Sequence, residues 1–279
     1  MLKSIAQNPD IGPPNLFDSF TEAARTSFEF LQLRLSQNAL LKKTPTLKER
    51  PIIVLPGFLA ADWTTSEIRK FLAQKGQNVY GWDAGMNTGP SHRILNHLKN
   101  HLDEIYDVHN GQKVTLIGHS LGGVFARELA KNFAEKIEQV ITLGSPFRAA
   151  HHPQSVAPIV RLVFDTMNGN NHAYHKDKPI SKQAHFPPPV PTTSIFSKSD
   201  GVVNWQTCLN PRQPRSENIE VYGSHCGLVF NKLAMIVIAD RLFVVQDRKK
   251  WKPFNIVDDN ESLFPSQDHY RSTMKMKHA

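Results

Sequence analysis

The chain is poor in cysteine, which excludes several classes of protein. Its two cysteines, Cys208 and Cys226, are too few for a disulfide framework and lack the spacing of a metal site. We expect two buried free thiols, with a disulfide joining two late loops as the alternative. Long apolar runs are also missing, because no segment approaches the roughly 20 residues that cross a bilayer, and residues 1–10 lack the apolar stretch of a secretory signal. These absences favour a cytoplasmic protein.

Positively charged residues moderately outnumber negatively charged ones. The net charge is +8, but the basic residues are scattered apart from residues 248–250 and Lys252, and no nucleic-acid-binding motif accompanies them. We therefore expect no nucleic-acid partner. Apolar residues make up 40% of the 279 residues, near the share in globular proteins, so the chain can bury a substantial core in one large domain.

Residues 1–44 predict an amphipathic helical extension. Between Asn15 and Leu41, apolar side chains recur at steps of three and four, which places them on one face of a helix. This apolar stripe consists of Phe17, Phe20, Ala24, Phe28, Leu31 and Leu35. The helix either packs on the main domain, which we expect, or makes peripheral contact with a membrane or a partner. Basic side chains would help that contact at Arg25, Arg34, Lys42 and Lys43.

Residues 45–246 predict an α/β fold with a doubly wound, mostly parallel sheet, because short apolar runs alternate with helical segments. We expect strands over Ile52–Leu55, Asn78–Trp82, Lys113–Ile117, Gln139–Leu143, Thr193–Phe196 and Asn218–Tyr222, and helices over Thr64–Ala73, Ser91–Val108, Leu121–Phe133 and Leu228–Phe243. A helical cap insertion at about 148–191 breaks the alternation at the edge where such sheets bind ligands. A polar tail follows from 247 to 279, with poor order expected from about Asn260.

One serine lies where a nucleophile is presented. Gly118-His119-Ser120-Leu121-Gly122 joins an apolar run to a helix-like stretch, so Ser120 is expected on a strained strand-to-helix turn with its hydroxyl directed outward. The glycines two positions either side allow the strand and the helix to pass closely. We expect His119 to pack beside the strand.

A serine hydroxyl needs a base and a carboxylate that orients that base. Asp200 follows one predicted strand and His225 follows the last, which places both at the same sheet edge as Ser120. Asp165 and Asp177 in the cap are weaker candidates for the acid.

The negative charge of a tetrahedral intermediate needs fixed donors. The backbone N–H of Leu121, at a helix N-terminus, and that of Phe58, after the first strand, are the expected pair. For Pro56-Gly57, a simple strand-ending turn is the alternative.

Two histidine pairs have a spacing that suits metal ligands, namely His97 with His101 and His172 with His175. No carboxylate or cysteine pattern completes either set. We expect solvated polar faces there, no metal and no cofactor.

Five segments resemble landmarks of the α/β-hydrolase family, in its lipase and esterase branch. In chain order they are Leu55-Pro56-Gly57-Phe58, Gly118-His119-Ser120-Leu121-Gly122-Gly123, Thr142-Leu143-Gly144-Ser145-Pro146, Asp200-Gly201-Val202-Val203 and Gly223-Ser224-His225. The resemblance covers roughly Arg50–Phe243. It implies Ser120 as nucleophile, Asp200 as acid, His225 as base, and Phe58 and Leu121 as oxyanion donors. Many lipases carry a His-Gly pair at the first oxyanion loop, whereas Pro56 precedes Gly57 here, which keeps the backbone donor in a different setting.

The expected function is hydrolysis of a small-molecule carboxylic ester through an acyl-enzyme on Ser120. The cap is apolar at Val156, Ile159, Val160, Leu162, Val163, Phe164 and Met167, which favours lipid-like or acyl esters unless these residues only cover the sheet. The same triad would serve an acyltransferase or a thioesterase. A binding protein that kept only the fold is the second rival, and the oligomeric state is not predicted.

Overall fold

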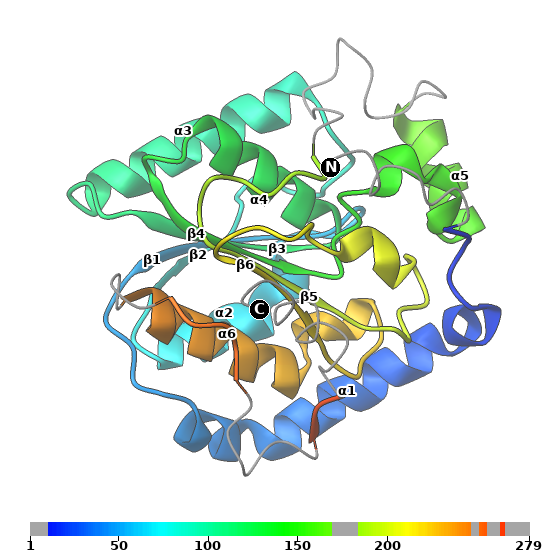
Figure 1. The fold of residues 1–279 in the computed structure, drawn as a ribbon, viewed down its shortest axis with the longest axis horizontal. Helices are drawn as coiled ribbons and strands as arrows, with labels where there is room; N and C mark the ends of the chain where they lie inside the picture. Colours follow the sequence, from blue (N-terminus) through cyan, green and yellow to red (C-terminus); the bar gives the residue numbers. More distant parts are fainter. Residues whose placement is uncertain (1–10, 169–183, 247–250, 256–262, 266–279) are drawn as a thin grey trace, which may run out of the picture.

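Six parallel strands form one sheet in the order β2-β1-β3-β4-β5-β6 (Figure 1). The computed structural model describes residues 11–168, 184–246, 251–255 and 263–265. The strands are β1 (Pro51–Leu55), β2 (Asn78–Tyr80), β3 (Val114–His119), β4 (Ile137–Leu143), β5 (Thr192–Phe196) and β6 (Ser216–Glu220). Each predicted strand is found within a few residues of its expected bounds, and the predicted α/β class with a parallel sheet is confirmed.

Helices cover both faces of this sheet. They are α1 (Leu16–Lys43), α2 (Ser66–Gln74), α3 (His92–Val108), α4 (Leu121–Asn132), α5 (Pro158–Asn168) and α6 (Lys232–Gln246). The pair α3 and α4 lies on one face, and α2 and α6 lie on the other, with α1 packed outside α6 (Figure 1). None of the helices in the described part of the chain has the length and apolarity needed to cross a membrane.

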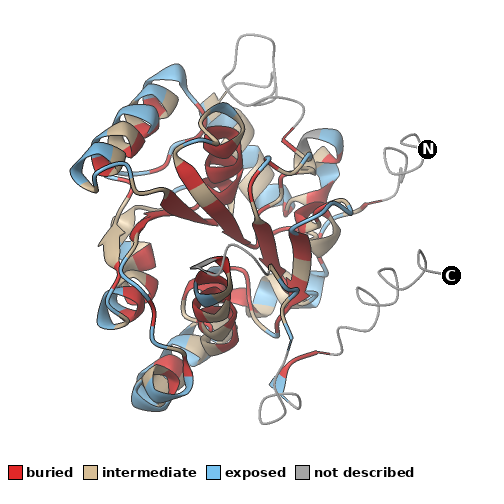
Figure 2. Cartoon of the chain, turned by 60° about the vertical axis from the view of Figure 1, so that its left-hand side comes forward, coloured by how far each residue is buried: buried red, intermediate tan, exposed pale blue. Residues whose placement is uncertain are grey.

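The sheet is the centre of the core, buried between the two helical layers (Figure 2). Every residue of β1 and β3 is buried, which explains why β1 is apolar throughout rather than alternating between apolar and polar side chains. Before α6, the chain forms a 3-10 turn over Cys226–Val229, and the side chain of Asn231 accepts hydrogen bonds from the N–H groups of Leu233 and Ala234. This helix therefore starts later than expected, because an asparagine caps it.

The apolar stripe of α1 faces away from the domain. All six stripe residues are exposed, whereas Leu33, Leu40 and the carboxylate of Glu22 are buried on the opposite side of the helix. The helix packs on the domain as expected, but not through its apolar stripe. Hydrogen bonds from loops of the main domain to α1 decide which face is turned inward.

Parts of the cap and of the tail also pack. Short 3-10 turns over Ala149–His151 and Pro153–Ser155 lead into α5, while residues 169–183 lie outside the described residues. In the predicted tail, Phe264 is buried and its ring lies 5.6 Å from that of Phe254. The remaining tail residues, 247–250, 256–262 and 266–279, are not among those described.

Candidate active site

Ser120 lies at the junction of β3 and α4 in a strained backbone conformation. Its φ is 51° and its ψ is −123°, a region that non-glycine residues rarely adopt. The N–H of Ser120 donates to the carbonyl of Leu143 at 2.8 Å, and the carbonyl of Ser120 accepts from the N–H of Gly123 at 3.0 Å. These bonds hold the residue in place from both sides.

The flanking glycines are required by close backbone contacts. A β-carbon at Gly118 would collide with the backbone of Gly123, and one at Gly122 would collide with the carbonyl oxygen of Leu55. Strand β3, helix α4 and the end of β1 meet at these positions. The spacing of glycines around Ser120 in the sequence thus has a steric cause.

Asp200 and His225 form a buried pair. The Nδ1 of His225 lies 2.7 Å from Oδ2 of Asp200, and each residue is only 3% exposed. The other carboxylate oxygen of Asp200 accepts from the N–H groups of Val202 at 2.9 Å and Val203 at 2.8 Å. Both acceptor atoms of Asp200 are therefore in use, and its orientation toward His225 is fixed.

Gly144, at the end of β4, leaves room for this pair. Its φ is +53°, and a β-carbon there would lie 2.8 Å from Leu228 and 3.2 Å from both Oδ2 of Asp200 and Nδ1 of His225. A side chain at this position would press on Asp200 and His225 together. The glycine in the Thr142–Pro146 segment thus belongs to the site.

The loop that carries His225 contacts the residue before Ser120. The Nε2 of His119, the residue before Ser120, lies 2.9 Å from the carbonyl oxygen of His225, and the two imidazole rings are 5.0 Å apart. Among the described residues, no hydrogen bond joins the hydroxyl of Ser120 to His225. Such contacts commonly tighten only when substrate binds.

The two histidines differ in charge preference. Burial opposes protonation of His225, but Asp200 and then Glu22 outweigh it, so the pKa of His225 is raised above 6.5. Burial, assisted by His225, lowers the pKa of His119 to about 3. His119 is therefore neutral at physiological pH, and of the two rings only that of His225 readily accepts a proton.

The backbone N–H groups of Phe58 and Leu121 lie free beside Ser120. Neither has an acceptor within the part of the chain that the structure describes. A β-carbon at Gly57 would lie 3.0 Å from the β-carbon of Ser120, which places the Gly57-Phe58 loop against the nucleophile. The buried Asn87 fixes this loop, since its side chain donates to Pro56 at 2.9 Å and its carbonyl accepts from Leu59 at 2.7 Å.

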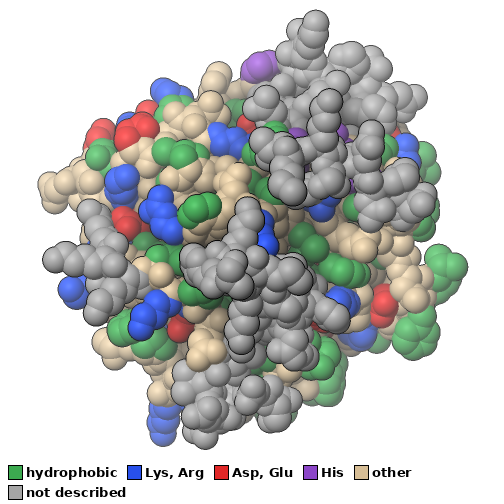
Figure 3. All heavy atoms as spheres, in the orientation of Figure 1, with side chains coloured by type: hydrophobic (Ala, Val, Ile, Leu, Met, Phe, Trp, Pro, Cys, Tyr) green, Lys and Arg blue, Asp and Glu red, His purple; other side chains and the backbone are tan. Residues whose placement is uncertain are grey.

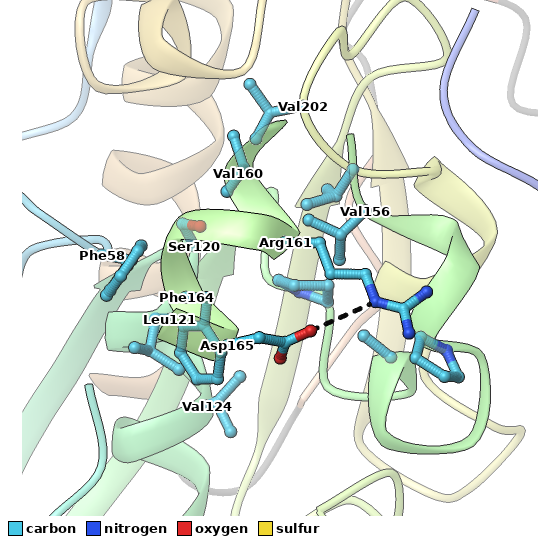
Figure 4. Close-up of a pocket in the computed structure, with 14 residues that line it drawn as sticks. Phe58, Ser120, Leu121, Val124, Val156, Val160, Arg161, Phe164, Asp165 and Val202 are labelled. Carbon is cyan, nitrogen blue, oxygen red and sulfur yellow. Dashed lines mark ion pairs between the residues drawn. The ribbon is translucent and has the colours of Figure 1, made fainter. Parts of the chain in front are cut away.

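A largely apolar pocket, open to solvent, extends from Ser120 (Figure 4). Phe58 and Leu121 lie near Ser120, while Val156 and Val160 of the cap line the wall nearby. On the outer side of α5, Ile159 is 67% exposed. The cap therefore directs some of its apolar residues into the pocket and others to solvent.

Asp165, one of the two weaker candidates for the acid, also lines the pocket. Its carboxylate pairs with Arg161, one helical turn away, at 3.5 Å (Figure 4). Asp177, the other candidate, lies outside the described residues. Asp200 is thus the predicted acid that the structure pairs with His225.

The two cysteines and the histidine pair His97 and His101 form neither a disulfide nor a metal site among the described residues. Both thiols are free, Cys208 buried and Cys226 exposed, so the alternative of a disulfide is wrong and burial holds for one thiol only. His97 and His101 each lie 3.0 Å from a backbone carbonyl, and no group of three metal-binding side chains occurs among the described residues. The pair His172 and His175 lies outside that set.

Helix α1 contributes carboxylates that the sequence analysis missed. Oε1 of Glu22 accepts from the N–H of Cys226 at 2.8 Å, and Oε2 of Glu22 accepts from that of Gly201 at 3.2 Å. Oε1 of Glu29 accepts from the N–H of Ser224 at 2.7 Å. The only signal in the sequence is that these acidic residues lie opposite the apolar stripe.

Comparison with known proteins agrees with this geometry. Residues 50–174 match the model of a family described as alpha/beta hydrolase fold. Aspergillus fumigatus lipase B is similar at 15% identity and a TM-score of 0.51, over 72% of this chain and 54% of that one. The chain thus has the α/β-hydrolase fold, and its resemblance to that family is confirmed.

Two further solved structures are similar at lower TM-scores. One is the monoacylglycerol lipase of Paleococcus ferrophilus, with 15% identity and a TM-score of 0.47 over 72% of this chain and 96% of that one. The other is MGS-MChE2, an alpha/beta hydrolase enzyme from a sediment metagenome of the lagoon of Mar Chica, with 19% identity and a TM-score of 0.48 over 74% and 94%.

Proposed function

We propose that this protein is a serine hydrolase of carboxylic esters. The observation that carries the proposal is the buried Asp200–His225 pair at 2.7 Å, whose His225 carbonyl contacts the residue before Ser120, a serine with a φ of 51°. In the proposed reaction, His225 takes the proton of Ser120 while the hydroxyl oxygen attacks the ester carbonyl. His225 then protonates the leaving alcohol. A water molecule, deprotonated by His225, attacks the acyl-enzyme, and His225 returns this proton to the oxygen of Ser120 as the acid is released.

The oxyanion of each tetrahedral intermediate is proposed to accept hydrogen bonds from the N–H groups of Phe58 and Leu121. Leu121 is the first residue of α4, so the positive end of the helix dipole adds to its donor. One such fixed donor contributes about 3 kcal/mol to the transition state. Asn87 supports this role because it fixes the loop that carries Phe58.

The proposed substrate is an ester with an apolar acyl chain. The pocket next to Ser120 is lined by Val156, Val160 and Phe164, and the ring of Phe164 lies 5.0 Å from that of Phe58. Such a surface favours lipid-like esters over polar ones. A reducing, cytoplasmic location is part of the proposal, since both thiols are free.

A chain-length series of p-nitrophenyl esters tests this function. The wild type is expected to prefer longer acyl chains, and Ser120→Ala is expected to lose turnover while keeping its circular dichroism spectrum. A fluorophosphonate probe should label Ser120 in the wild type, with the label mapped by mass spectrometry. Unchanged turnover of Ser120→Ala would remove the proposed nucleophile.

The same assay separates the proposal from acyl transfer. With an added alcohol or thiol, a hydrolase still releases mainly free acid, whereas an acyltransferase forms mainly the new ester or thioester. A series of acyl thioesters run beside the oxygen esters would identify a thioesterase by a higher kcat/KM. Either outcome would replace the proposed reaction while keeping the nucleophile.

A further inference from the structure

The inner face of α1 connects two loops that lie far apart in the sequence. The loop after β5 carries Asp200, and the loop after β6 carries His225. The carboxylate of Glu22 accepts one hydrogen bond from each loop, at Gly201 and at Cys226. Both donors directly follow a member of the proposed triad, so a single buried side chain fixes the backbone beside the acid and beside the base.

Neighbouring residues of α1 reinforce the same connection. Thr26 and Glu29 bond the hydroxyl and the N–H of Ser224, at 3.0 and 2.7 Å, and the guanidinium of Arg25 donates to the carbonyl of Ser199 at 2.7 Å. Residues on both sides of the acid and of the base are therefore bound to this helix.

Two glycines let the helix approach this closely. A β-carbon at Gly201 would collide with the backbone carbonyl of Asp18, and one at Gly227 would collide with the carboxylate of Glu29. The loops and the helix are thus fitted to each other at the level of backbone atoms.

Glu22 also interacts electrostatically with His225. Burial raises the pKa of Glu22, while the N–H of Cys226, His225 and Arg25 favour its ionised form. Around His225, Asp200 and Glu22 present acidic groups, and the buried His119 presents a neutral ring. A carboxylate behind the base stabilises the imidazolium that forms when Ser120 loses its proton.

We propose that Glu22 is a positioning residue for the acid and the base. Its carboxylate keeps the Asp200 loop and the His225 loop in a fixed relative position and adds negative charge behind the imidazole. This inference rests on the proposed hydrolase function.

The test compares Glu22→Gln with the matched control Glu67→Gln. Glu67 is a buried carboxylate of α2 that pairs with Arg34 of α1 and with Lys70 but contacts neither loop. In Glu22→Gln one loop N–H faces an amide NH₂ instead of an acceptor, so kcat should fall about 10-fold with KM within about twofold. The acid limb of the kcat/KM profile should also move to lower pH, because a charge that favours the imidazolium is gone. Glu67→Gln should keep both values.

Three results are decisive. If Glu22→Gln lowers the melting temperature but leaves kcat and the pH midpoint of the folded enzyme unchanged, α1 serves stability alone and the inference is wrong. Wild-type kcat and pH profile with no change in stability would overturn it as well. If Ser120→Ala stays active, the hydrolase proposal itself has failed. This result is distinct from a Glu22→Gln variant with unchanged kcat and pH profile.

The outer face of α1 supports a second, independent inference. Phe20 is 86% exposed and Leu35 is 81% exposed, and hydrophobic side chains project at the right-hand edge of Figure 3, where the N-terminal part of α1 lies. From Phe17 to Leu35 the stripe spans roughly 27 Å at 1.5 Å per residue. A row of exposed apolar side chains along one helix face is typical of an interaction surface, unlike apolar residues that are exposed singly.

The charges of α1 indicate what covers this face. All three acidic residues of the helix, Asp18, Glu22 and Glu29, lie near the domain rather than on the stripe, whereas Lys42 and Lys43 are exposed at its C-terminal end. The chain as a whole carries a net charge of +8. From this we infer that the outer face of α1 docks on an anionic lipid surface, with the stripe in the apolar layer and the lysines at the headgroups.

Co-sedimentation with vesicles tests this docking surface. The full chain should bind vesicles of phosphatidylcholine with phosphatidylglycerol, and less so vesicles of phosphatidylcholine alone. The triple variant Phe20→Gln, Phe28→Gln, Leu35→Gln should bind at least about 10-fold more weakly. Val108→Gln, at a residue of α3 that is 67% exposed, is the matched control and should bind like the wild type.

Equal vesicle binding by the triple variant and the wild type would overturn the inference that the outer face of α1 docks on a lipid surface. So would a wild-type dimer that the triple variant converts to a monomer in analytical ultracentrifugation, since the stripe would then be covered by a second copy of the chain.

Discussion

The proposed nucleophile and the proposed acid–base pair of the candidate site are positioned in different ways. Ser120 is held where β3 and α4 meet the adjoining strands of the sheet, through a strained φ, two neighbouring glycines and bonds to Leu143 and Gly123. Asp200 and His225 lie on loops whose flanking N–H groups bond to carboxylates of α1, 179 and 204 residues away in the sequence for Glu22. One part of the site is local, and the other is assembled from distant segments.

This difference predicts where each part is vulnerable. The environment of Ser120 should resist changes at the surface of the molecule, because its geometry is built into β3, α4 and the adjoining strands of the sheet. The acid–base pair should respond to changes at the contact between α1 and the loops, even where these do not touch the reacting atoms. The predictions below test this contrast.

The largest effect is expected for Asp200→Asn. An asparagine stabilises the wrong tautomer of His225, so kcat should fall about 10⁴-fold. Steady-state kinetics on a p-nitrophenyl ester measures it. Asp165→Asn is the control, because Asp165 also lines the pocket but pairs with Arg161. A loss with Asp165→Asn that equals or exceeds the loss with Asp200→Asn would mean that the acid is misassigned.

Phe58→Pro tests the local part of the site. Proline removes the N–H that is proposed to bind the oxyanion, so kcat should fall at least about 100-fold. Phe58→Ala keeps the N–H and loses only ring contacts such as that with Phe164, so its main effect should be a higher KM. The two variants are compared in one kinetic series, and similar losses of kcat would count against the backbone donor.

Gly227→Ala tests the distant part. The new β-carbon would collide with the carboxylate of Glu29, which should lower the free energy of unfolding by about 1–3 kcal/mol and reduce kcat. Gly12→Ala is the control, since a β-carbon there meets nothing within 4 Å. Denaturant unfolding and kcat are measured for both. A stable, fully active Gly227→Ala would show that the contact between Glu29 and the loop is unimportant.

The pH profile gives the smallest but most specific effect. His225 acts as a base only when neutral, and Asp200 and Glu22 raise its pKa against the effect of burial. The acid limb of kcat/KM should therefore have its midpoint above pH 6.5, with activity rising as pH rises through it. His119 should not add a second step near neutrality, because its pKa is lowered to about 3. A midpoint at or below 6.5 would contradict the raised pKa.

The local part of the site could be predicted from the sequence. The segment around Ser120 carries its own steric requirements, since the glycines, the preceding apolar run and the following helix lie within a few residues of one another. The strands were predictable for the same reason, because runs such as Pro51–Leu55 are apolar throughout and buried throughout. The location of Asp200 and His225 was predictable because each follows the end of a strand, and the carboxyl ends of parallel strands lie at the same edge of the sheet.

The role of α1 could not be predicted in this way. Helical periodicity predicts which side chains share a face, but it does not predict which face packs on the domain. The buried face of α1 combines Leu33 and Leu40 with Glu22. The carboxylate of Glu22 is stable there because it accepts hydrogen bonds from loop N–H groups that would otherwise lack an acceptor. Those donors lie in segments whose position relative to α1 emerges only in the folded chain.

The contact between Glu22 and the two loops bears on any attempt to trim the molecule. A shortened polypeptide starting at β1 would retain the sheet and the elbow, yet it would leave the amides of Gly201 and Cys226 without their acceptor. A truncation designed to keep the Asp200–His225 pair in place should therefore begin ahead of α1, upstream of the segment from residue 50 onward that matches the hydrolase family.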